Sequence, residues 1–358
     1  MENQEMEKRV LSSNSTKCSN CGASIRYSPK VNNLACESCG SVFEFEKSKD
    51  FQKQPLRDES LLTEDNKSWS NESKIFKCES CGAEVVLNSL EYSQNCPYCG
   101  NSHVSETTNL PGIKPHCVVP FSFDEESASE KFKAGVKKKF FVPGAFKKNI
   151  PRNNIHAIYT PVFSFDVNTR TTYNGVLSES YTVKRSDGSV ETKYRRFNIS
   201  GTKDLKYTDY IVESSSKFNN LQIESILPYN FNEAYKFDNN FISGYVVEHY
   251  QDSLDKCYDF AKENMEYDIK RKILSSYSYS SVESFNMDVD YSNEKYLYRL
   301  VPTYVFEFKY KEKNYKALMN GQTGKLGSGL PKSGFKIALC IIIPLLLFIG
   351  MALLIALS

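Results

Sequence analysis

Eight of the eleven cysteines form two groups with the same spacing, and thiolates at this spacing can chelate a metal ion. Each group reads C-x2-C-x14-C-x2-C, and the flanking residues also match, as in KCSNCGA and KCESCGA. The two groups are Cys18, Cys21, Cys36 and Cys39, and Cys78, Cys81, Cys96 and Cys99. The pattern therefore predicts two copies of one metal-binding unit.

A glycine follows the second cysteine of every pair, at positions 22, 40, 82 and 100. Glycine supplies the positive φ of a tight turn on which two thiolates face one ion. Two such turns complete the tetrahedral shell of structural zinc, and the metal stabilises a unit that is too short for an apolar core. We expect two structural Zn²⁺ ions, with a redox dithiol, disulfides and iron as the alternatives.

A shell closed by four thiolates leaves zinc no open coordination position, so we interpret both units as recognition modules and not as catalytic centres. Residues 77–106 carry one lysine and four glutamates, and residues 17–45 carry three basic and two acidic side chains. Neither unit has the cationic surface that phosphate binding requires. We therefore expect a protein partner, and nucleic acid is the less favoured ligand.

The long apolar run over residues 337–357 contains no charged residue. As an α-helix it is about 31 Å long, which matches the hydrocarbon core of a bilayer, and a membrane helix tolerates Pro344. The alternative is a buried helix of a soluble core. Lys325, Lys332 and Lys336 precede the run, so the positive-inside rule predicts a single-pass protein of the cell membrane with its N-terminal body in the cytoplasm. Cysteines in that compartment stay reduced, which favours metal over disulfides.

The composition of the 358 residues gives no global charge signal, because 45 basic side chains face 43 acidic ones. The first residues lack the apolar segment of a secretory signal peptide. The 23 tyrosines and 23 phenylalanines favour strands. We predict an α+β fold class with these parts: a disordered N-terminus over 1–16, zinc ribbons over 17–45 and 75–106, a flexible charged linker over 46–74, an aromatic-rich α+β domain over 117–330, and a transmembrane helix over 337–357.

The α+β domain divides into two candidate halves, 117–215 and 216–330. TPVFSFDV and VPTYVFEF are similar aromatic strands, and a predicted helix precedes each one, over 127–141 and 252–275. In the first helix Phe132, Val136 and Phe140 form one stripe among lysines. We expect this stripe to face the core, and contact with anionic lipid is the alternative. Asp187-Gly188 predicts a hairpin turn.

No catalytic motif is recognisable. The segment GQTGKL lacks the four-residue spacing and the Ser or Thr of a phosphate-binding loop, and Asn320-Gly321 is more simply a turn. The four histidines form no triad or zinc-protease motif. We therefore expect a protein that is not an enzyme, and an active site assembled by the fold of the middle domain is the alternative.

The chain resembles a bacterial family of membrane proteins with TFIIB-type zinc ribbons. The resemblance rests on KCESCGAEV, NCPYCG, YTPVFSFDV, MNGQTGKL and the terminal apolar run, and it covers most of the chain. Such proteins are often labelled as similar to the primosomal replication-restart helicase, but this chain has no nucleotide-binding loop and no motor. The resemblance implies an adaptor at the membrane, beside SPFH-type or other membrane-stress scaffold proteins.

These observations converge on a membrane-anchored cytoplasmic adaptor or scaffold that recruits or assembles protein partners, in a membrane-stress response. A membrane-tethered nucleic-acid-binding protein and an enzyme in the middle domain are the other two hypotheses.

Overall fold

The structure is a computed structural model that describes residues 9–10, 17–56, 73–78, 84–88, 104–107, 113–151, 154–215, 218 and 220–357. For 9–10, 73–76, 78, 84–88, 104–107 and 352–357 it describes the backbone alone. The prediction of a mixed α+β chain with an aromatic-rich middle and one C-terminal apolar helix is confirmed. The predicted disordered N-terminus over 1–16 lies almost entirely outside the described residues.

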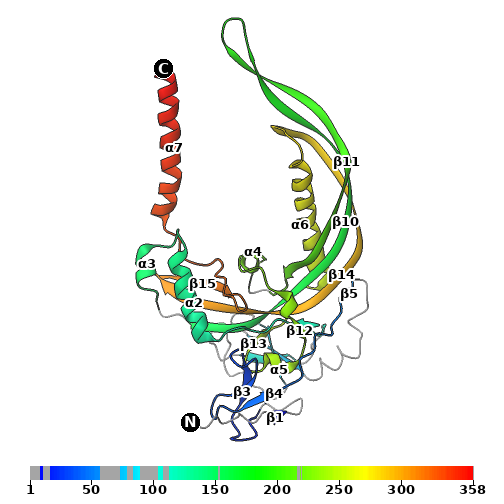
Figure 1. Ribbon diagram of the computed structural model, residues 1–358, viewed down its shortest axis with the longest axis vertical. Coiled ribbons are helices and arrows are strands. Elements are labelled where there is room, and N and C mark those ends of the chain that lie inside the picture. The colour runs from blue at the N-terminus through cyan, green and yellow to red at the C-terminus, as the bar shows by residue number, and fades with distance from the viewer. Residues whose placement is uncertain are drawn as a thin grey trace, which may run out of the picture.

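A small four-stranded sheet lies at the N-terminal end, in the order β1-β4-β3-β2 (Figure 1). Its strands are β1 (Arg9–Val10), β2 (Ile25–Ser28), β3 (Asn33–Cys36) and β4 (Val42–Glu44). The inward side chains Ile25, Tyr27, Leu34 and Phe43 are buried. This alternation of buried and exposed positions is what a half-buried strand requires.

The large sheet is built around three long strands, β10 (Asn154–Lys184), β11 (Val190–Glu213) and β14 (Ser281–Tyr310). β10 is central, because it pairs antiparallel with both β11 and β14. The shorter strands of this sheet are β5 (Gln54–Pro55), β6 (Ser73–Cys78), β7 (Glu84–Asn88), β8 (Val104–Thr107), β9 (Cys117–Val118), β12 (Tyr235–Lys236), β13 (Val246–Glu248) and β15 (Lys313–Asn320).

The distal halves of the long strands form a curved three-stranded arm that rises away from the core (Figure 1). We define the arm as residues 168–184, 190–206 and 281–292. The predicted turn at Asp187-Gly188 is confirmed and forms the tip of the arm, with Gly188 at φ +84°. Leu177 and Ile199 of the arm form a small buried cluster with Leu274. Nearer the tip, over 179–184 and 190–198, most side chains are polar and exposed, so cross-strand hydrogen bonds hold the strands together there.

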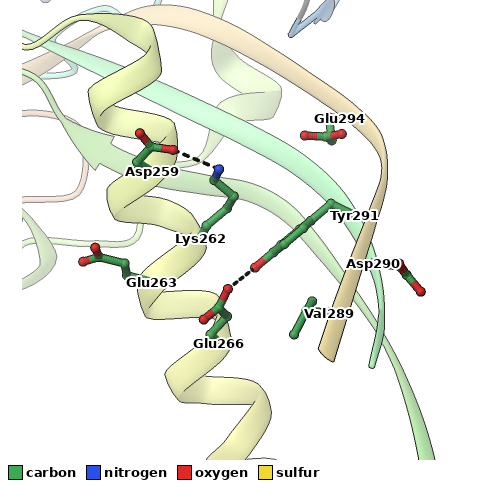
Figure 2. A pocket seen from close by; sticks show the side chains of 8 residues that line it. All are labelled: Asp259, Lys262, Glu263, Glu266, Val289, Asp290, Tyr291 and Glu294. Atoms are coloured by element: carbon green, nitrogen blue, oxygen red, sulfur yellow. Dashed lines mark hydrogen bonds and ion pairs between the residues drawn. The ribbon is translucent and has the colours of Figure 1, made fainter. Parts of the chain in front are cut away.

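The long helix α6 (Leu254–Leu274) lies against the concave side of the arm (Figure 1). Met265, Ile269 and Ile273 recur at a helical spacing and are buried. On the neighbouring face, Tyr291 Oη donates a 2.8 Å hydrogen bond to Glu266 across a groove between α6 and β14 (Figure 2). The predicted helix over 252–275 therefore exists, and Ser253 caps its first turn.

At the other end of the sheet, α2 (Glu125–Lys138) and α3 (Gly144–Lys148) form a corner. Phe132 and Val136 of α2 are buried, and Phe132 stacks on Phe306 of β14 at 4.1 Å between ring centroids. The predicted core-facing stripe is thus confirmed for two of its three residues. Phe140 differs: α2 ends at Lys138, so Phe140 lies beyond the helix and is exposed.

The remaining helices in the described part of the chain are α4 (Asn220–Glu224), the 3-10 turn η2 (Phe231–Glu233), α5 (Asn239–Ile242) and α7 (Gly334–Leu357). The apolar run over 337–357 lies within α7, which begins three residues earlier than predicted. Figure 1 shows α7 leaving the body beside the α2–α3 corner. Among the described residues, α7 is the one helix long and apolar enough to cross a membrane, and none of its window Gly334–Met351 is buried.

The segment 46–56, part of the predicted flexible linker, lies on the large sheet. β5 pairs antiparallel with β14, opposite Lys295 and Tyr296. Lys53 Nζ forms ion pairs with Asp166 at 2.6 Å and Asp209 at 2.9 Å. These contacts differ from the prediction because charges that look solvated in the sequence meet partners from distant strands. Residues 57–72 of the predicted linker lie outside the described residues.

The registers of the large sheet relate the two candidate halves to each other. Pro161 and Pro302 occupy the same position in the two similar sequence segments. These segments lie antiparallel beside each other in the sheet, where Pro302 pairs with Tyr159 and Pro161 pairs with Leu300. β9 pairs parallel with β14, and β13 pairs parallel with β10. Each half thus runs strand, helix, long hairpin, and lends its first strand to the hairpin of the other half. This reciprocal pairing is what a two-fold arrangement of two like units produces.

Candidate metal centre

The first cysteine group sits on two turns of the same geometry, one before β2 and one between β3 and β4. In the first turn, the N–H of Gly22 donates to the carbonyl of Cys18 at 2.8 Å. In the second, the N–H of Gly40 donates to the carbonyl of Cys36 at 2.9 Å. Both glycines have φ +74°, a left-handed conformation that a side chain disfavours. The sequence-based role of these glycines is therefore confirmed for the first group.

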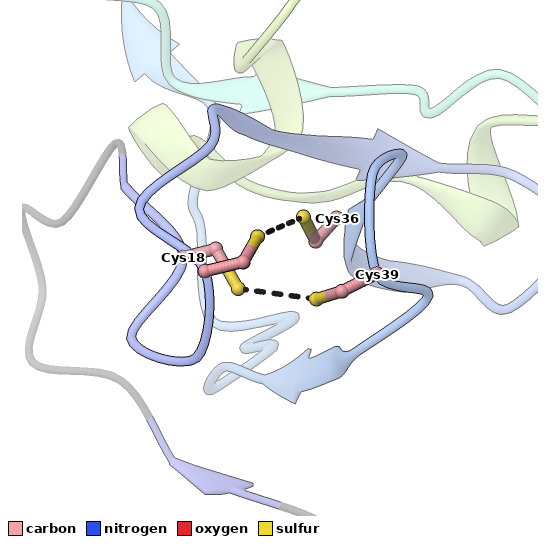
Figure 3. A group of neighbouring side chains, drawn as sticks. Cys18, Cys36 and Cys39 are labelled. Carbon is pink, nitrogen blue, oxygen red and sulfur yellow. Dashed lines mark hydrogen bonds between the residues drawn. The ribbon is translucent and has the colours of Figure 1, made fainter.

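The four thiols of this group converge. Their sulfur atoms all lie within 4.8 Å of one another, and two of the distances are 3.5 Å, Cys18 Sγ to Cys39 Sγ and Cys21 Sγ to Cys36 Sγ. Figure 3 shows Cys18, Cys36 and Cys39 pointing toward one another from the two turns. Sulfurs about 2.3 Å from a tetrahedral zinc ion lie about 3.8 Å apart. The cluster therefore has the donor set and the size for one metal ion with four thiolate ligands.

The cluster combines a thiol that ionises readily with one that does not. Hydrogen bonds from the side chain and backbone of Ser41 lower the pKa of Cys39 to about 6. The backbone N–H of Ala23 favours the thiolate of Cys21, but hydrogen bonds with Cys36 and Cys39 outweigh it and raise the pKa of Cys21 to about 12. Thiols this close share protons, because several negative charges repel one another. A divalent cation would remove that repulsion and release the protons.

Two polar side chains connect the turns, and sequence reasoning did not single them out. Asn20 Nδ2 donates to Ser41 Oγ at 2.7 Å, and Ser41 Oγ lies 3.1 Å from Cys39 Sγ. Such partners orient the ligands of a metal site. The second group has Ser80 and Asn101 at the corresponding places, so the same two residue types recur with their positions exchanged. That exchange is the signal in the sequence that points to this contact.

The second cysteine group lies outside the described residues, except for the backbone of Cys78 at the end of β6. The assignment of Cys78, Cys81, Cys96 and Cys99 as metal ligands therefore stays a prediction. The strands around the group are described: β6 pairs with β7 and β8, and β7 pairs with β13 of the large sheet.

The small sheet that carries the first group is packed on the body. Tyr27 of β2 is buried and packs against Phe241 of α5, with ring centroids 5.5 Å apart, and Phe45 packs against the same ring at 4.9 Å. The N–H of Tyr27 donates to the carbonyl of Ser243 at 3.0 Å, and Ser243 Oγ donates to the carbonyl of Ile25 at 3.0 Å. The metal centre is therefore held on the large sheet by an aromatic cluster and two hydrogen bonds.

A buried guanidinium is the main polar feature that the sequence did not reveal. Arg299 of β14 is 2% exposed, although it is flanked by apolar strand residues. Its Nε donates to Ser164 Oγ at 2.7 Å, its Nη2 forms an ion pair with Asp209, and its Cζ lies 4.0 Å from the ring centroid of Phe231. Asp209 also pairs with Lys53, so this network joins the two long hairpins to Lys53 and supplies the carboxylate that a buried guanidinium requires.

The groove between α6 and β14 has a volume of ≈ 630 Å³ and is lined by five carboxylates and one lysine (Figure 2). Three of these six side chains are engaged within the groove, since Lys262 pairs with Asp259 at 2.9 Å and Glu266 accepts from Tyr291. In the part of the chain that the structure describes, the four cysteines are the group whose ligand atoms converge on one point. We therefore assign the metal centre to the cysteines and no ligand to the groove.

Comparison with known proteins adds one relative. The chain is 25% identical over 325 residues to "Uncharacterized protein YdjG" of Bacillus subtilis (strain 168), across 90% of this chain and 92% of that protein. No family model matches the chain, and no solved structure matches it. The likeness to the Bacillus protein thus concerns nearly the whole of both chains and is not limited to the cysteine motif. A C-terminal helix that can cross a membrane and a four-cysteine cluster that can hold a metal are the two features on which a function can be built.

Proposed function

We propose that this protein is a membrane-anchored adaptor that uses zinc ribbons to recruit or assemble protein partners at the membrane. The observation that carries the proposal is the separation between the four-cysteine sheet and α7. The four-cysteine sheet lies at one end of the body and α7 leaves from the other (Figure 1). A helix that anchors the chain would thus hold the metal centre away from the bilayer, where a cytoplasmic partner can reach it.

Zinc in the first site has a structural role in this proposal. Four thiolates fill a tetrahedral shell, so no position is left for substrate or water. The small sheet buries few large side chains of its own, and bound metal would supply much of its folding free energy. We extend the same role to the second cysteine group because its spacing and flanking residues match.

The surface of the first ribbon favours a protein partner over nucleic acid. Arg26 forms an ion pair with Glu37, and Lys30 pairs with Asp124 at 2.6 Å. Lys47 donates to the carbonyl of Asn32 and to Asn33 Oδ1. These cations are engaged within the protein, whereas phosphate binding needs a row of accessible ones. The cytoplasmic orientation rests on the lysines that precede α7.

The test is co-purification of the tagged full-length protein from its own membranes in mild detergent. Three chains are compared: the unaltered protein, the double variant Cys18→Ser with Cys36→Ser, and Cys257→Ser as the matched control, since Cys257 is a buried thiol on α6 outside the cluster. We expect a stoichiometric protein partner with the unaltered chain and the control, and its loss from the double variant together with one zinc ion per chain.

Other outcomes would reject the proposal. A partner retained by the double variant would show that the first ribbon is not needed to recruit it. Nucleic acid retained in place of a protein, and released as salt is raised, would favour the membrane-tethered nucleic-acid-binding alternative. Equal zinc content in all three chains would show that the first site does not bind zinc.

A further inference from the structure

Three exposed phenylalanines gather where α7 leaves the body. Phe140 is 60% exposed, Phe141 is 44% exposed and Phe335 is 76% exposed. Phe140 and Phe141 follow the end of α2, and their ring centroids are 5.2 Å apart. Phe335 is the second residue of α7 and directly precedes Lys336 and the apolar run. Large aromatic side chains exposed together in this way mark a surface that binds something.

Hydrogen bonds tie this corner to the start of α7. The N–H of Ser333 donates to the carbonyl of Phe141 at 2.8 Å. Lys336 Nζ donates to the carbonyls of Phe140 and Val142 at 2.9 and 3.0 Å, and it lies 5.3 Å from the ring centroid of Phe140. The corner therefore lies at the level at which α7 begins, whichever direction the rest of that helix takes.

The corner is also basic. Seven lysines lie close in sequence to the phenylalanines, and the segments 131–152 and 325–336 that carry them contain no acidic residue. The lysines are Lys137, Lys138, Lys139, Lys147, Lys148, Lys332 and Lys336. Lys137, Lys138 and Lys139 are exposed, as are Lys148 and Lys332. The nearby turn after β14 adds Lys311, Glu312 and Lys313, which keeps the balance positive.

We propose that this corner, composed of Phe140, Phe141, Phe335 and the seven lysines, is an interfacial patch that binds the anionic headgroup layer of the bilayer. The proposal rests on the proposed membrane attachment and adds a second contact to it. Aromatic rings next to a membrane helix favour the headgroup level, and lysines beside them favour anionic lipid. Lipid is the occupant because the patch is continuous with a helix that the body leaves uncovered.

The interfacial patch would orient the body. A single helix fixes the distance of a domain from the bilayer but leaves the domain free to rotate. A second contact through the α2–α3 corner removes that freedom, and Phe132 stacked on Phe306 transmits the orientation to the large sheet. The core-facing stripe of α2 does not explain the lysines on the same helix, and the proposed contact with lipid does.

The test places a fluorescent reporter in the patch of the full-length chain. Phe140→Trp is made together with Trp69→Phe, which removes the one native tryptophan. The chain is reconstituted into phosphatidylcholine vesicles with and without phosphatidylserine, and a spin label near the lipid headgroups serves as the quencher. We expect quenching in the anionic vesicles at least twice that of a control, Tyr194→Trp with Trp69→Phe, whose reporter is an exposed aromatic position on the arm.

A charge variant and an insertion assay complete the design. Lys138→Glu, Lys139→Glu and Lys148→Glu are combined in the reporter chain, and we expect quenching to fall to the level of the Tyr194→Trp control. Leu347→Cys in a Cys340→Ser chain reports insertion of α7 through protection from a water-soluble maleimide, read by peptide mass spectrometry.

The two proposals fail in different ways. Quenching equal to the control while Leu347→Cys stays protected would overturn the interfacial patch and leave the membrane anchor in place. Quenching that stays the same after the lysine substitutions, or without phosphatidylserine, would overturn the choice of anionic lipid. Rapid labelling of Leu347→Cys in vesicles would overturn the anchor, and the patch with it.

Discussion

At the scale of single residues, the four-cysteine cluster depends on the backbone conformation of two glycines as well as on its sulfur atoms. A Cβ built on Gly22 or Gly40 meets no atom within 4 Å, so space does not exclude a side chain at either position. Their φ of +74° does disfavour one. A substitution by alanine at either glycine therefore tests the backbone conformation without introducing a steric clash.

We expect Gly22→Ala to weaken zinc binding at the first site without removing a ligand. A left-handed conformation costs an L-residue roughly 1–2 kcal/mol, which corresponds to about a five- to thirtyfold loss of affinity. The measurement is chelator competition in a chain whose second group is removed by Cys78→Ser and Cys96→Ser. Gly144→Ala is the control, because Gly144 also has open space but lacks the positive φ. Equal affinity in both variants would contradict the role of the turn.

A second residue-scale prediction concerns Glu213 at the end of β11. Burial, together with the nearby charges of Glu248 and Asp252, raises the pKa of Glu213 to about 9, although hydrogen bonds from Ser215 favour the charged form. An unfolded glutamate titrates near 4.5. Between these values the folded chain holds a proton that the unfolded chain has lost, so stability falls as the pH rises through this window.

The measurement is the free energy of unfolding of the detergent-solubilised chain between about pH 5.5 and 8.5, inside that window. Glu213 contributes a slope of up to about −1.4 kcal/mol per pH unit, and Glu213→Gln should remove that contribution and leave the variant the more stable protein at the alkaline end. Glu179→Gln, on the exposed part of the arm, is the control. Parallel pH profiles for the unaltered chain and Glu213→Gln would show that the carboxyl is ionised in the fold.

At the scale of elements, the attachment of the small sheet to the large one decides whether the metal centre is a rigid part of the body. Phe241 of α5 is fully buried and contacts Tyr27, Phe45 and Tyr235. The contact joins β2 and the chain after β4 to β12 and α5, which come much later in the sequence. The Phe241 ring thus packs the small sheet against the body.

We expect Phe241→Ala to detach the small sheet while its metal stays bound. Removing a buried phenylalanine costs about 3–5 kcal/mol, of which the local interface takes the largest share. Hydrogen exchange should then accelerate at residues 25–28 and 243–245, with zinc content unchanged. Leu221→Ala is the control, because Leu221 is 74% exposed. Slow exchange in the Phe241→Ala chain would mean that the backbone hydrogen bonds between Tyr27 and Ser243 suffice to hold the sheet.

At the scale of the whole molecule, the arm and α7 rise from the same side of the body (Figure 1). The tip of the arm carries exposed Lys184, Arg185 and Asp187, and such side chains are costly in hydrocarbon. If α7 crosses a bilayer, the arm has to stay in water. The helix then has to tilt away from the arm beyond Lys336, because hydrogen bonds from Ser333 and Lys336 hold its first turn to the α2–α3 corner.

We therefore expect Asp187→Cys to be labelled by a water-soluble maleimide in sealed vesicles, from the same side as the N-terminal body. The Cys340→Ser chain with Leu347→Cys, protected in the bilayer, is the comparison, and peptide mass spectrometry reads both sites. Labelling of Asp187→Cys only after the vesicles are opened would place the arm tip across the membrane from the body. That result would exclude the tilt of α7 away from the arm.

Features encoded by short-range spacing were predictable from the sequence. The convergence of Cys18, Cys21, Cys36 and Cys39 follows from two tight turns with glycine, and the turn at Asp187-Gly188 follows from local backbone preference. The apolar run marks α7 because no charge interrupts it. Each of these signals needs only neighbouring residues, and the structure agrees with each of them where it describes the chain.

The tertiary structure alone decided the rest, because the deciding partners are distant in sequence. The arm extends far beyond the predicted aromatic strand, because pairing between β10, β11 and β14, which are distant in sequence, holds its many polar residues in extended conformation. Arg299 is buried because Asp209, Ser164 and Phe231 come from three other segments. Phe140 is exposed because α2 ends two residues before it. The sequence by itself determined which cysteines can hold a metal and which segment can cross a membrane, and the long-range pairing determined how the cysteine cluster and α7 are placed on the body.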